Sequence, residues 1–154
     1  MLAAWLDFHR ATLARKCEGL TDEQVRLRSV PPSSLSLLGL VRHIAEVERG
    51  WFRQVLAGEE VPDIYATEQD QEADFNGTAG ADVAAAFATW TAECDKARQN
   101  MAAFGSLDDE ARRPTGRGSV VTLRWIMVHM IEEYARHNGH ADLLRERIDG
   151  AVED

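Results

Sequence analysis

An apolar repeat over residues 122–149 constrains the fold of this chain more than any other feature. Its members follow one another at alternating steps of four and three residues: Leu123, Met127, Met130, Tyr134, His137, Ala141, Leu144 and Ile148. A helix with this spacing presents one continuous stripe to the neighbouring helices of a bundle. The repeat therefore predicts a single long helix packed along its length, with His137 at a core position.

Three polar side chains lie beside this stripe. At about 100° of rotation per residue, Glu133 falls roughly 60° from the centre of the stripe, His140 about 80° and His129 about 100°, so burial should decrease in that order. Glu133 and His137 are four residues apart, which allows both to bind one metal ion from the same side of the helix. The pair alone equally allows Glu133 to pair with Arg136 or His137 while His137 is a hydrogen-bonded core histidine.

Helical spacing of apolar residues recurs in three further segments, which predict helices over residues 2–18, 33–57 and 81–104. A glycine follows each of them, in the position where glycine commonly ends a helix. Neither strand alternation nor a glycine-rich nucleotide-binding motif occurs, and 154 residues suit one domain. We expect an all-α four-helix bundle over residues 1–154, with first and second connections long enough to cross between the ends of the bundle.

The second predicted helix carries a histidine between two glycines. Its expected core face consists of Leu37, Leu40, Ile44, Val47, Trp51 and Val55. His43 lies roughly 90° from the centre of that face, and its neighbours on the helix surface are Gly39, Glu46 and Gly50. A glycine inside a helix costs about 1 kcal/mol relative to alanine, which suggests a close backbone approach or open space beside His43. The glycines could equally admit a bulky neighbour such as Trp125, with His43 at the edge of the core.

The connections and the remaining candidate ligands give weaker signals. Residues 59–77 form the longest predicted loop, which could cover one end of the bundle as a lid or act as a plain linker. Residues 21–24 predict a short helical turn in the first connection. Cys17 and Cys94 are isolated within helical patterns and are expected to be buried. His9 has no second ligand at helical spacing, so we expect it at the surface or at the edge of the core.

The charge balance excludes some classes of partner. The chain has 26 acidic and 17 basic residues, for a net charge of −9, and no basic cluster that could neutralise a phosphate backbone. Nucleic acid is therefore not an expected partner. No apolar run approaches the roughly 20 residues needed to cross a bilayer, and the N-terminus lacks the pattern of a secretion signal. We expect a cytoplasmic protein that does not associate with membranes.

Together, His43, Glu133 and His137 supply two imidazoles and one carboxylate from two helices. Helix bundles build metal sites from side chains of this kind that project inward. Three protein ligands leave coordination positions open for water or substrate, as in catalytic sites. A di-iron site is excluded because neither Glu132 nor Glu133 has a histidine three residues later. We expect this triad to bind one divalent ion.

Two stretches of the sequence resemble a known superfamily. Residues 35–52 read LSLLGLVRHIAEVERGWF, and residues 136–150 read RHNGHADLLRERIDG. Both are similar to the DinB/YfiT-like superfamily, and within it to the branch related to the mycothiol-dependent maleylpyruvate isomerase. The similarity extends over nearly the whole chain and is weakest over residues 59–80.

The resemblance implies a ligand set. Members hold a divalent metal, commonly zinc or nickel, through one histidine of the second helix and a pair of residues on the fourth. Many members carry H-x-x-x-H on the fourth helix; here the second histidine of that motif matches His137 and the first matches Glu133, as in the isomerase branch. His140 stands where other members have glutamine, and it could be a fourth ligand or a supporting group.

The resemblance also implies a function. A low-molecular-weight thiol of the mycothiol kind would react with an electrophilic substrate at the open metal position, in an S-transfer or an isomerisation. Glu46 and His140 are candidates for supporting or acid–base roles. The alternatives are a metal-binding, stress-linked bundle without turnover and a metal-dependent hydrolase.

We also expect a homodimer. Members of the superfamily are often dimeric, and large exposed rings are common at interfaces, although they can also line a substrate pocket. The chain has many such rings for a bundle of this size to bury alone: Trp5, Phe8, Trp51, Phe52, Trp90 and Trp125.

Overall fold

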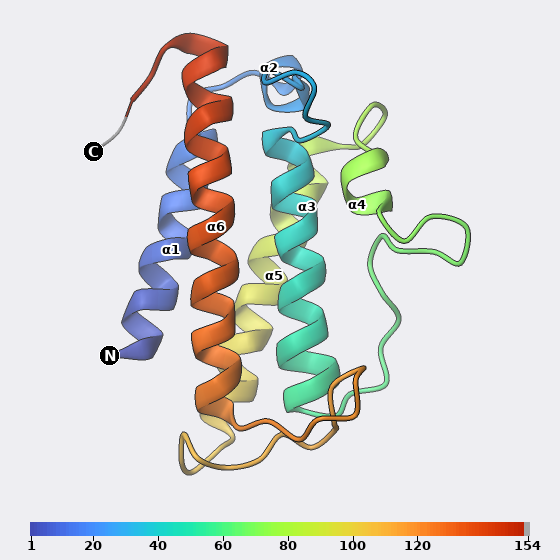
Figure 1. Cartoon of the computed structure of the whole chain (residues 1–154), viewed down its shortest axis with the longest axis vertical. Coiled ribbons are helices and arrows are strands. Elements are labelled where there is room, and N and C mark those ends of the chain that lie inside the picture. The colour runs from blue at the N-terminus through green and yellow to red at the C-terminus, as the bar shows by residue number, and fades with distance from the viewer. Residues whose placement is uncertain (153–154) are drawn as a thin grey trace.

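A computed structural model describes residues 1–152 and shows a helical protein, with no β-strand in that range (Figure 1). The final two residues of the domain predicted over residues 1–154 lie outside the described range. The four long elements are α1 (Leu2–Cys17), α3 (Leu37–Glu48) with its π-helical continuation η1 (Arg49–Leu56), α5 (Val83–Ala102) and α6 (Leu123–Asp149). Two short helices in the connections are α2 (Asp22–Arg26) and α4 (Ala73–Asn76). The predicted all-α four-helix bundle is confirmed.

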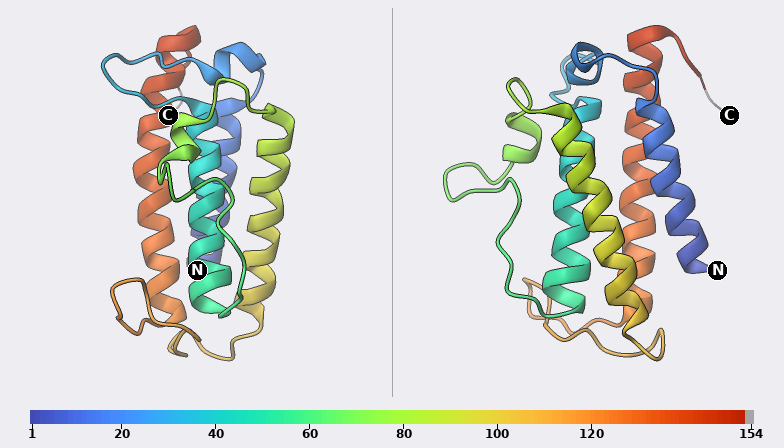
Figure 2. Two further views of the ribbon diagram at one scale, coloured as in Figure 1. Left: turned by 90° about the vertical axis from the view of Figure 1, so that its right-hand side faces the viewer. Right: turned by 180° about the vertical axis from the view of Figure 1, so that it is seen from behind.

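The long helices do not alternate in direction along the chain. α1 and α6 run one way, whereas α3–η1 and α5 run the other way (Figures 1 and 2). α1 packs mainly on α6, and α3 packs mainly on α5. Only the second connection crosses from one end of the bundle to the other. On its way it lies along the outside of α3 (Figure 2). The first connection joins two helix ends at the same end of the bundle.

Side-chain caps define where the two site-bearing helices begin. The Ser36 hydroxyl accepts a hydrogen bond from the Gly39 N–H at 3.1 Å at the start of α3. The Thr122 hydroxyl accepts one from the Trp125 N–H at 3.3 Å at the start of α6. Such caps satisfy backbone donors that have no partner inside the helix. They fix the boundaries from which the positions of the site residues follow.

The inward face of the second helix differs from the expected one from residue 47, where Val47 is only partly buried and Glu48 is fully buried, and the difference continues into η1. Phe52 and Leu56 are fully buried, whereas Trp51 and Val55, which were predicted for the core, are only partly buried. The cause is the π-helical geometry of η1, because its i→i+5 hydrogen bonds widen each turn relative to an α-helix. The inward positions therefore move on by one residue, and Trp51 turns toward the side of the bundle.

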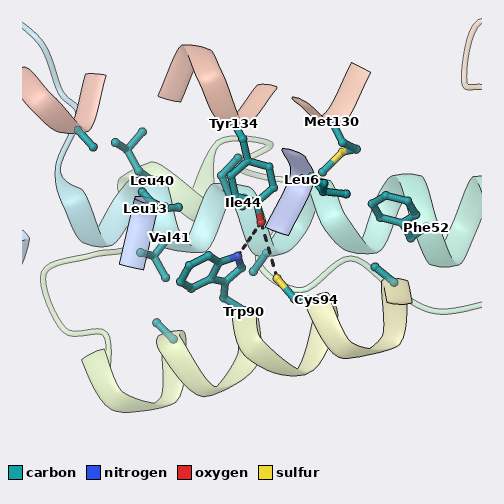
Figure 3. Packing of buried hydrophobic residues seen from close by; sticks show 14 of the residues in the cluster. Leu6, Leu13, Leu40, Val41, Ile44, Phe52, Trp90, Cys94, Met130 and Tyr134 are labelled. Carbon is teal, nitrogen blue, oxygen red and sulfur yellow. Dashed lines mark hydrogen bonds between the residues drawn. The ribbon is translucent and has the colours of Figure 1, made fainter. Parts of the chain in front are cut away.

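A polar cluster joins the four long helices inside the apolar core. Arg10 of α1 donates two hydrogen bonds to the carboxylate of Glu48, both at 2.8 Å, and the Tyr134 hydroxyl of α6 donates one at 2.7 Å. From α5, Trp90 donates to the Tyr134 oxygen at 2.9 Å, and the Cys94 thiol lies 3.7 Å from the same oxygen (Figure 3). The Cys94 thiol also lies 3.6 Å from Glu48 Oε1. Glu48 is fully buried, so these partners compensate the lost hydration of its charge.

The third connection closes the end of the bundle where α6 begins. The N–H groups of Arg112 and Arg113 donate to the carbonyls of Leu56 and Val55 at 3.0 and 3.1 Å. These bonds satisfy carbonyls at the end of η1 that have no partner within the helix. Within residues 1–152, no helix is long and apolar enough to span a membrane.

Candidate metal centre

Three side chains from α3 and α6 converge where these two helices pack against each other. One ligand atom from each of His43, Glu133 and His137 lies within 4.8 Å of the other two. His137 Nε2 is 3.5 Å from Glu133 Oε2, and the ring centroids of His43 and His137 are 4.7 Å apart. The structure therefore brings together all three residues that the sequence predicted as metal ligands.

Helix packing explains this convergence. Glu133 and His137 are one turn apart on α6, and α3 lies against that face, so His43 approaches the pair from the opposite side. His137 is 8% exposed and belongs to the seam of α6, as its spacing predicted. The Glu133 side chain is 15% exposed and that of His129 is 25% exposed, which agrees with the order expected from their angles to the seam.

Asp74 supports His43 from the second connection. His43 Nδ1–H donates to Asp74 Oδ2 at 2.8 Å, which leaves His43 Nε2 as its free nitrogen. Asp74 is only 6% exposed, and its other oxygen accepts the Phe75 N–H at 2.9 Å. A carboxylate that accepts from the far nitrogen of a histidine is a common support for metal ligands, because it fixes the tautomer and makes the free nitrogen more basic.

Residues 59–77 form neither a featureless loop nor a lid over the bundle end. Within the segment, α4 places Phe75 against His43, with stacked rings 4.6 Å apart. Arg42 holds this turn by donating to the carbonyls of Asp74 and Ala73 at 2.9 and 2.7 Å. A Cβ on Gly39 would lie 3.3 Å from Cδ1 of Phe75. Gly39 therefore admits Phe75 and not Trp125, whereas a Cβ on Gly50 would meet only Gln54 Oε1, at 3.9 Å.

Glu46 binds the same connection at another point. Its carboxylate accepts hydrogen bonds from the N–H groups of Ile64, Tyr65 and Ala66, the shortest of which is 2.6 Å, to Tyr65. Charged acceptors of several backbone donors make strong hydrogen bonds. In this structure, Glu46 fixes the connection outside α3, whereas Asp74 makes the direct contact with His43.

Two further histidines flank the triad along α6. His140 Nδ1 lies 3.4 Å from His137 Nδ1, on the opposite side of the His137 ring from Glu133. His129 Nε2 lies 3.9 Å from Glu133 Oε1, an oxygen that also accepts from Arg136 at 3.2 Å. Glu133 thus makes both ion-pair contacts considered from the sequence, with Arg136 and His137, while it also faces His43 across the site.

The environment favours neutral, metal-competent imidazole at His137. Burial is the main cause that lowers the pKa of His137 to about 4, and the nearby charges of His43, His140 and Arg136 act in the same direction. A protonated imidazole cannot bind a metal, whereas a neutral one offers a free nitrogen. At neutral pH, His137 is therefore in the form that a metal ligand requires.

The two cysteines of the chain are not part of this centre. Cys17 and Cys94 are both buried, and burial is the main cause that raises the pKa of each thiol to about 12. The thiolate is the reactive form of cysteine, so neither side chain is a nucleophile near neutral pH. His9 also lies outside the triad, on α1, where its carbonyl accepts from the Asn138 amide at 3.1 Å.

The donor set fits a divalent transition metal. Imidazole nitrogens with a carboxylate oxygen suit zinc and its neighbours, and three protein ligands are typical of catalytic zinc sites. Sequence reasoning found this set but missed Asp74, which lies far from His43 along the chain and in a segment without helical periodicity. The one local signal of a contact with His43 was the acidic residue Asp74 followed by the aromatic residue Phe75 in an otherwise polar stretch.

Comparison with known proteins adds a family. The family model described as mycothiol-S-transferase matches residues 1–150, which is nearly the full length of the chain. This family is DinB/YfiT-like, so the resemblance read from residues 35–52 and 136–150 is confirmed. A search of curated proteins found no match.

Proposed function

Because the chain belongs to the mycothiol S-transferase family, we propose that it is a metal-dependent enzyme that joins a low-molecular-weight thiol of the mycothiol kind to an electrophilic substrate. The observation that carries the proposal is the triad of His43, Glu133 and His137 with its ligand atoms within 4.8 Å. Buried, protonated protein thiols are consistent with a sulfur atom supplied by a small molecule. Zinc or nickel is the proposed ion.

The proposed chemistry assigns each group one task. His43 Nε2, the Glu133 carboxylate and His137 Nε2 would hold the ion, which when bound would act as a Lewis acid that lowers the pKa of the thiol. The Asp74 carboxylate keeps the His43 ring oriented. His140 has a supporting role, because with Nε2 of His137 on the ion the Nδ1–H of His137 would donate to His140 Nδ1 and orient the His137 ring.

The bond changes balance without a further reactant. A carbon–sulfur bond forms as the bond from carbon to the leaving group breaks, and the electron pair of the broken bond departs with the leaving group. The thiol proton passes to solvent water or to the leaving group. In an isomerisation, the same thiol would add to an unsaturated substrate and later be expelled. Glu46 has a supporting role in this proposal, because its carboxylate is already occupied by backbone N–H groups.

Thiol binding is tested by cobalt substitution. The protein is loaded with cobalt and titrated with mycothiol, bacillithiol and glutathione, and the charge-transfer band of sulfur bound to cobalt is recorded. We expect a band with mycothiol that disappears in His137→Ala. If no thiol produces a band while the metal still exchanges water, the thiol proposal fails, and hydrolysis or metal binding without turnover is favoured instead.

The ligand set is tested by elemental analysis after reconstitution with zinc or nickel and dialysis. We expect one ion per chain, a strong loss in Glu133→Gln and a modest loss in His140→Ala, because Glu133 belongs to the triad. His9→Ala is the matched histidine control and should retain the ion. The opposite ranking of Glu133→Gln and His140→Ala would replace Glu133 by His140 in the ligand set.

We further propose a homodimer in the cytoplasm. Trp5 and Phe8 are each 52% exposed on α1 and touch edge to face, with ring centroids 5.7 Å apart. Phe52 and Trp90, in contrast, are buried within the chain itself. An exposed aromatic pair on a helix favours contact with a second apolar surface, and a second copy of the chain would provide one.

A further inference from the structure

A pocket opens beside the metal centre at the end of the bundle where α6 begins. Its volume is about 550 Å³, and its walls come from η1, the first turns of α6 and the third connection. Sites for small molecules typically have volumes of about 300–1,000 Å³. The residues that decide its chemistry are Trp51, Thr115, Arg117, Ser119, Trp125 and His129.

Three aromatic rings form one wall of this pocket. The rings of Trp125 and His129 are stacked, with centroids 5.1 Å apart and planes 12° apart. Trp51 approaches both, at 5.3 Å from Trp125 and 4.6 Å from His129. Trp125 nevertheless remains 46% exposed. This is a large aromatic surface that the protein leaves open and that can contact another planar ring.

The π-helical turn explains how Trp51 reaches this wall. In a regular α-helix, residue 51 would belong to the inward face with Ile44 and Leu40, whereas the wide turns of η1 place Phe52 inward. Trp51 is released from the core and meets Trp125 of α6. Short π-helical segments frequently occur at functional sites, and this one supplies a side chain to the pocket.

The polar part of the pocket favours an anion. Arg117 contributes a guanidinium, and no ion-pair partner for it occurs among residues 1–152. The remaining polar groups are the hydroxyls of Thr115 and Ser119 and the imidazole of His129, and the lining contains no carboxylate or amide side chain. An anionic group on an aromatic ring would find both of its requirements in this lining, a cation in Arg117 and an aromatic surface in Trp51 and Trp125.

The pocket is connected to the metal centre through His129. This residue lines the pocket and lies one turn before Glu133 on α6, with its Nε2 3.9 Å from Glu133 Oε1. A molecule held against Trp51 and Trp125 would therefore lie next to the triad of His43, Glu133 and His137. His140 contacts His137 on the other side of that triad.

We propose that this pocket binds a planar aromatic compound that carries an anionic group, with its ring against Trp51 and Trp125 and its anion toward Arg117. The assignment of this compound as the electrophilic substrate rests on the proposed thiol transfer. The binding itself does not require metal or thiol, so the two can be tested separately.

Calorimetric titration with naphthalene-2-sulfonate tests the proposal. We expect the wild-type protein to bind this probe and Trp125→Ala to bind on the order of tenfold more weakly, because a ring contact is lost. Arg117→Gln should weaken binding of the sulfonate by about threefold, as expected for an exposed ion pair, and leave binding of neutral 2-naphthol unchanged. Trp5→Ala and Arg28→Gln are the matched controls, because neither residue lines the pocket.

A pocket-filling variant tests the same claim without removing a side chain. A Cβ on Gly116, which lines the pocket, would meet no atom within 4 Å, and the same is true of Gly80, which lies elsewhere. Gly116→Leu should abolish binding of the sulfonate, whereas Gly80→Leu should not. If the wild-type protein fails to bind the probe, or if Trp5→Ala weakens binding as much as Trp125→Ala, the assignment is wrong.

A metal-free Glu133→Gln protein separates this inference from the proposed function. We expect it to bind naphthalene-2-sulfonate as the wild-type protein does. If the wild-type protein binds naphthalene-2-sulfonate but gives no cobalt–thiol band, the proposed thiol transfer is wrong and the aromatic site remains. A cobalt–thiol band without binding of the sulfonate would rule out the aromatic site and leave the proposed thiol transfer in place.

Discussion

Single side chains outside the triad support the proposed metal ligands. Asp74 is the clearest case, since its carboxylate accepts the Nδ1 proton of His43 and is itself almost fully buried. The bond keeps the free nitrogen of His43 directed at Glu133 and His137. A ligand without such support would lose orientation and basicity, which typically costs metal affinity.

Replacing Asp74 by asparagine should therefore weaken zinc binding by about tenfold to a hundredfold. The amide keeps the shape of the side chain but loses the charge. Affinity is measured by competition with a chromogenic chelator. Asp63→Asn is the matched control, because Asp63 lies in the same connection and contacts Gln54 instead of His43. Equal affinities for Asp74→Asn and the wild-type protein would show that the contact does not tune the metal.

Burial of Cys17 makes stability depend on alkaline pH. Burial raises the pKa of the Cys17 thiol from 9.0 to about 12, against the opposing effect of Arg145. The unfolded chain releases this proton near its ordinary pKa, whereas the folded protein keeps it. The resulting stabilisation is complete below about pH 9 and is lost as the pH rises toward 12.

Urea unfolding at pH 8, 9 and 10 measures this effect. The free energy of unfolding of the wild-type protein should fall more steeply with pH than that of Cys17→Ala, with a difference of at most about 1.4 kcal/mol per pH unit for one proton. Because slopes are compared, the stability lost through the smaller side chain does not enter. Parallel pH profiles for the two proteins would contradict the prediction.

Entire helices are held in register by the buried cluster around Glu48. This carboxylate is contacted from α1 by Arg10, from α5 by Cys94 and from α6 by Tyr134. Polar groups at this depth have definite partners, unlike apolar side chains, which tolerate sliding. The cluster thus aligns α3 with α6, and this alignment places His43 opposite Glu133.

Removing one member of the cluster should be strongly destabilising. Glu48→Ala leaves the buried Arg10 guanidinium with only the half-exposed Asp7, at 3.2 Å, as a charged partner and should cost about 3–5 kcal/mol. Tyr134→Phe leaves the Trp90 N–H without an acceptor and should cost about 1–3 kcal/mol. Chemical denaturation followed by circular dichroism measures both. Asp108→Ala, which removes an exposed pair with Arg124, should change little, and a comparable loss there would refute the special role of the cluster.

The helices and the convergence of Glu133 and His137 could be predicted from the sequence because both follow local periodicity. The steps of four and three along α6 identify its seam, and the four-residue step from Glu133 to His137 places the two side chains on one side. Gly39 gave a correct signal of close approach, but the sequence could not say that Phe75 was the neighbour. Contacts of that kind join segments without shared periodicity, so spacing alone does not predict them.

The π-helical turn shows a second reason for failure. Apolar side chains occur at both Trp51 and Phe52 and at both Val55 and Leu56, so the sequence fits the inward face of an α-helix and of a π-helix equally well. Packing against α5 decides in favour of Phe52 and Leu56. The aromatic pocket depends on whether Trp51 or Phe52 faces inward. The spacing of apolar residues could therefore not predict it.

The protein as a whole leaves Trp5 and Phe8 exposed on the outer side of α1. If this pair covers a second copy of the chain, light scattering at tens of micromolar protein should give the mass of a dimer. Trp5→Glu should then give a monomer with unchanged helix content, because a buried charge opposes association and Trp5 is not part of the core. A monomer mass for the wild-type protein would end the dimer proposal.

The order of the helices along the chain also has a consequence for when the centre can form during synthesis. His43 and Asp74 are made early, whereas Glu133 and His137 belong to the last helix. A nascent chain that ends before α6 has one imidazole and its supporting carboxylate but lacks two of the three proposed ligands. Loading with metal must therefore wait until α6 has been synthesised, and a chain that a stalled ribosome releases before α6 would bind no ion at this centre.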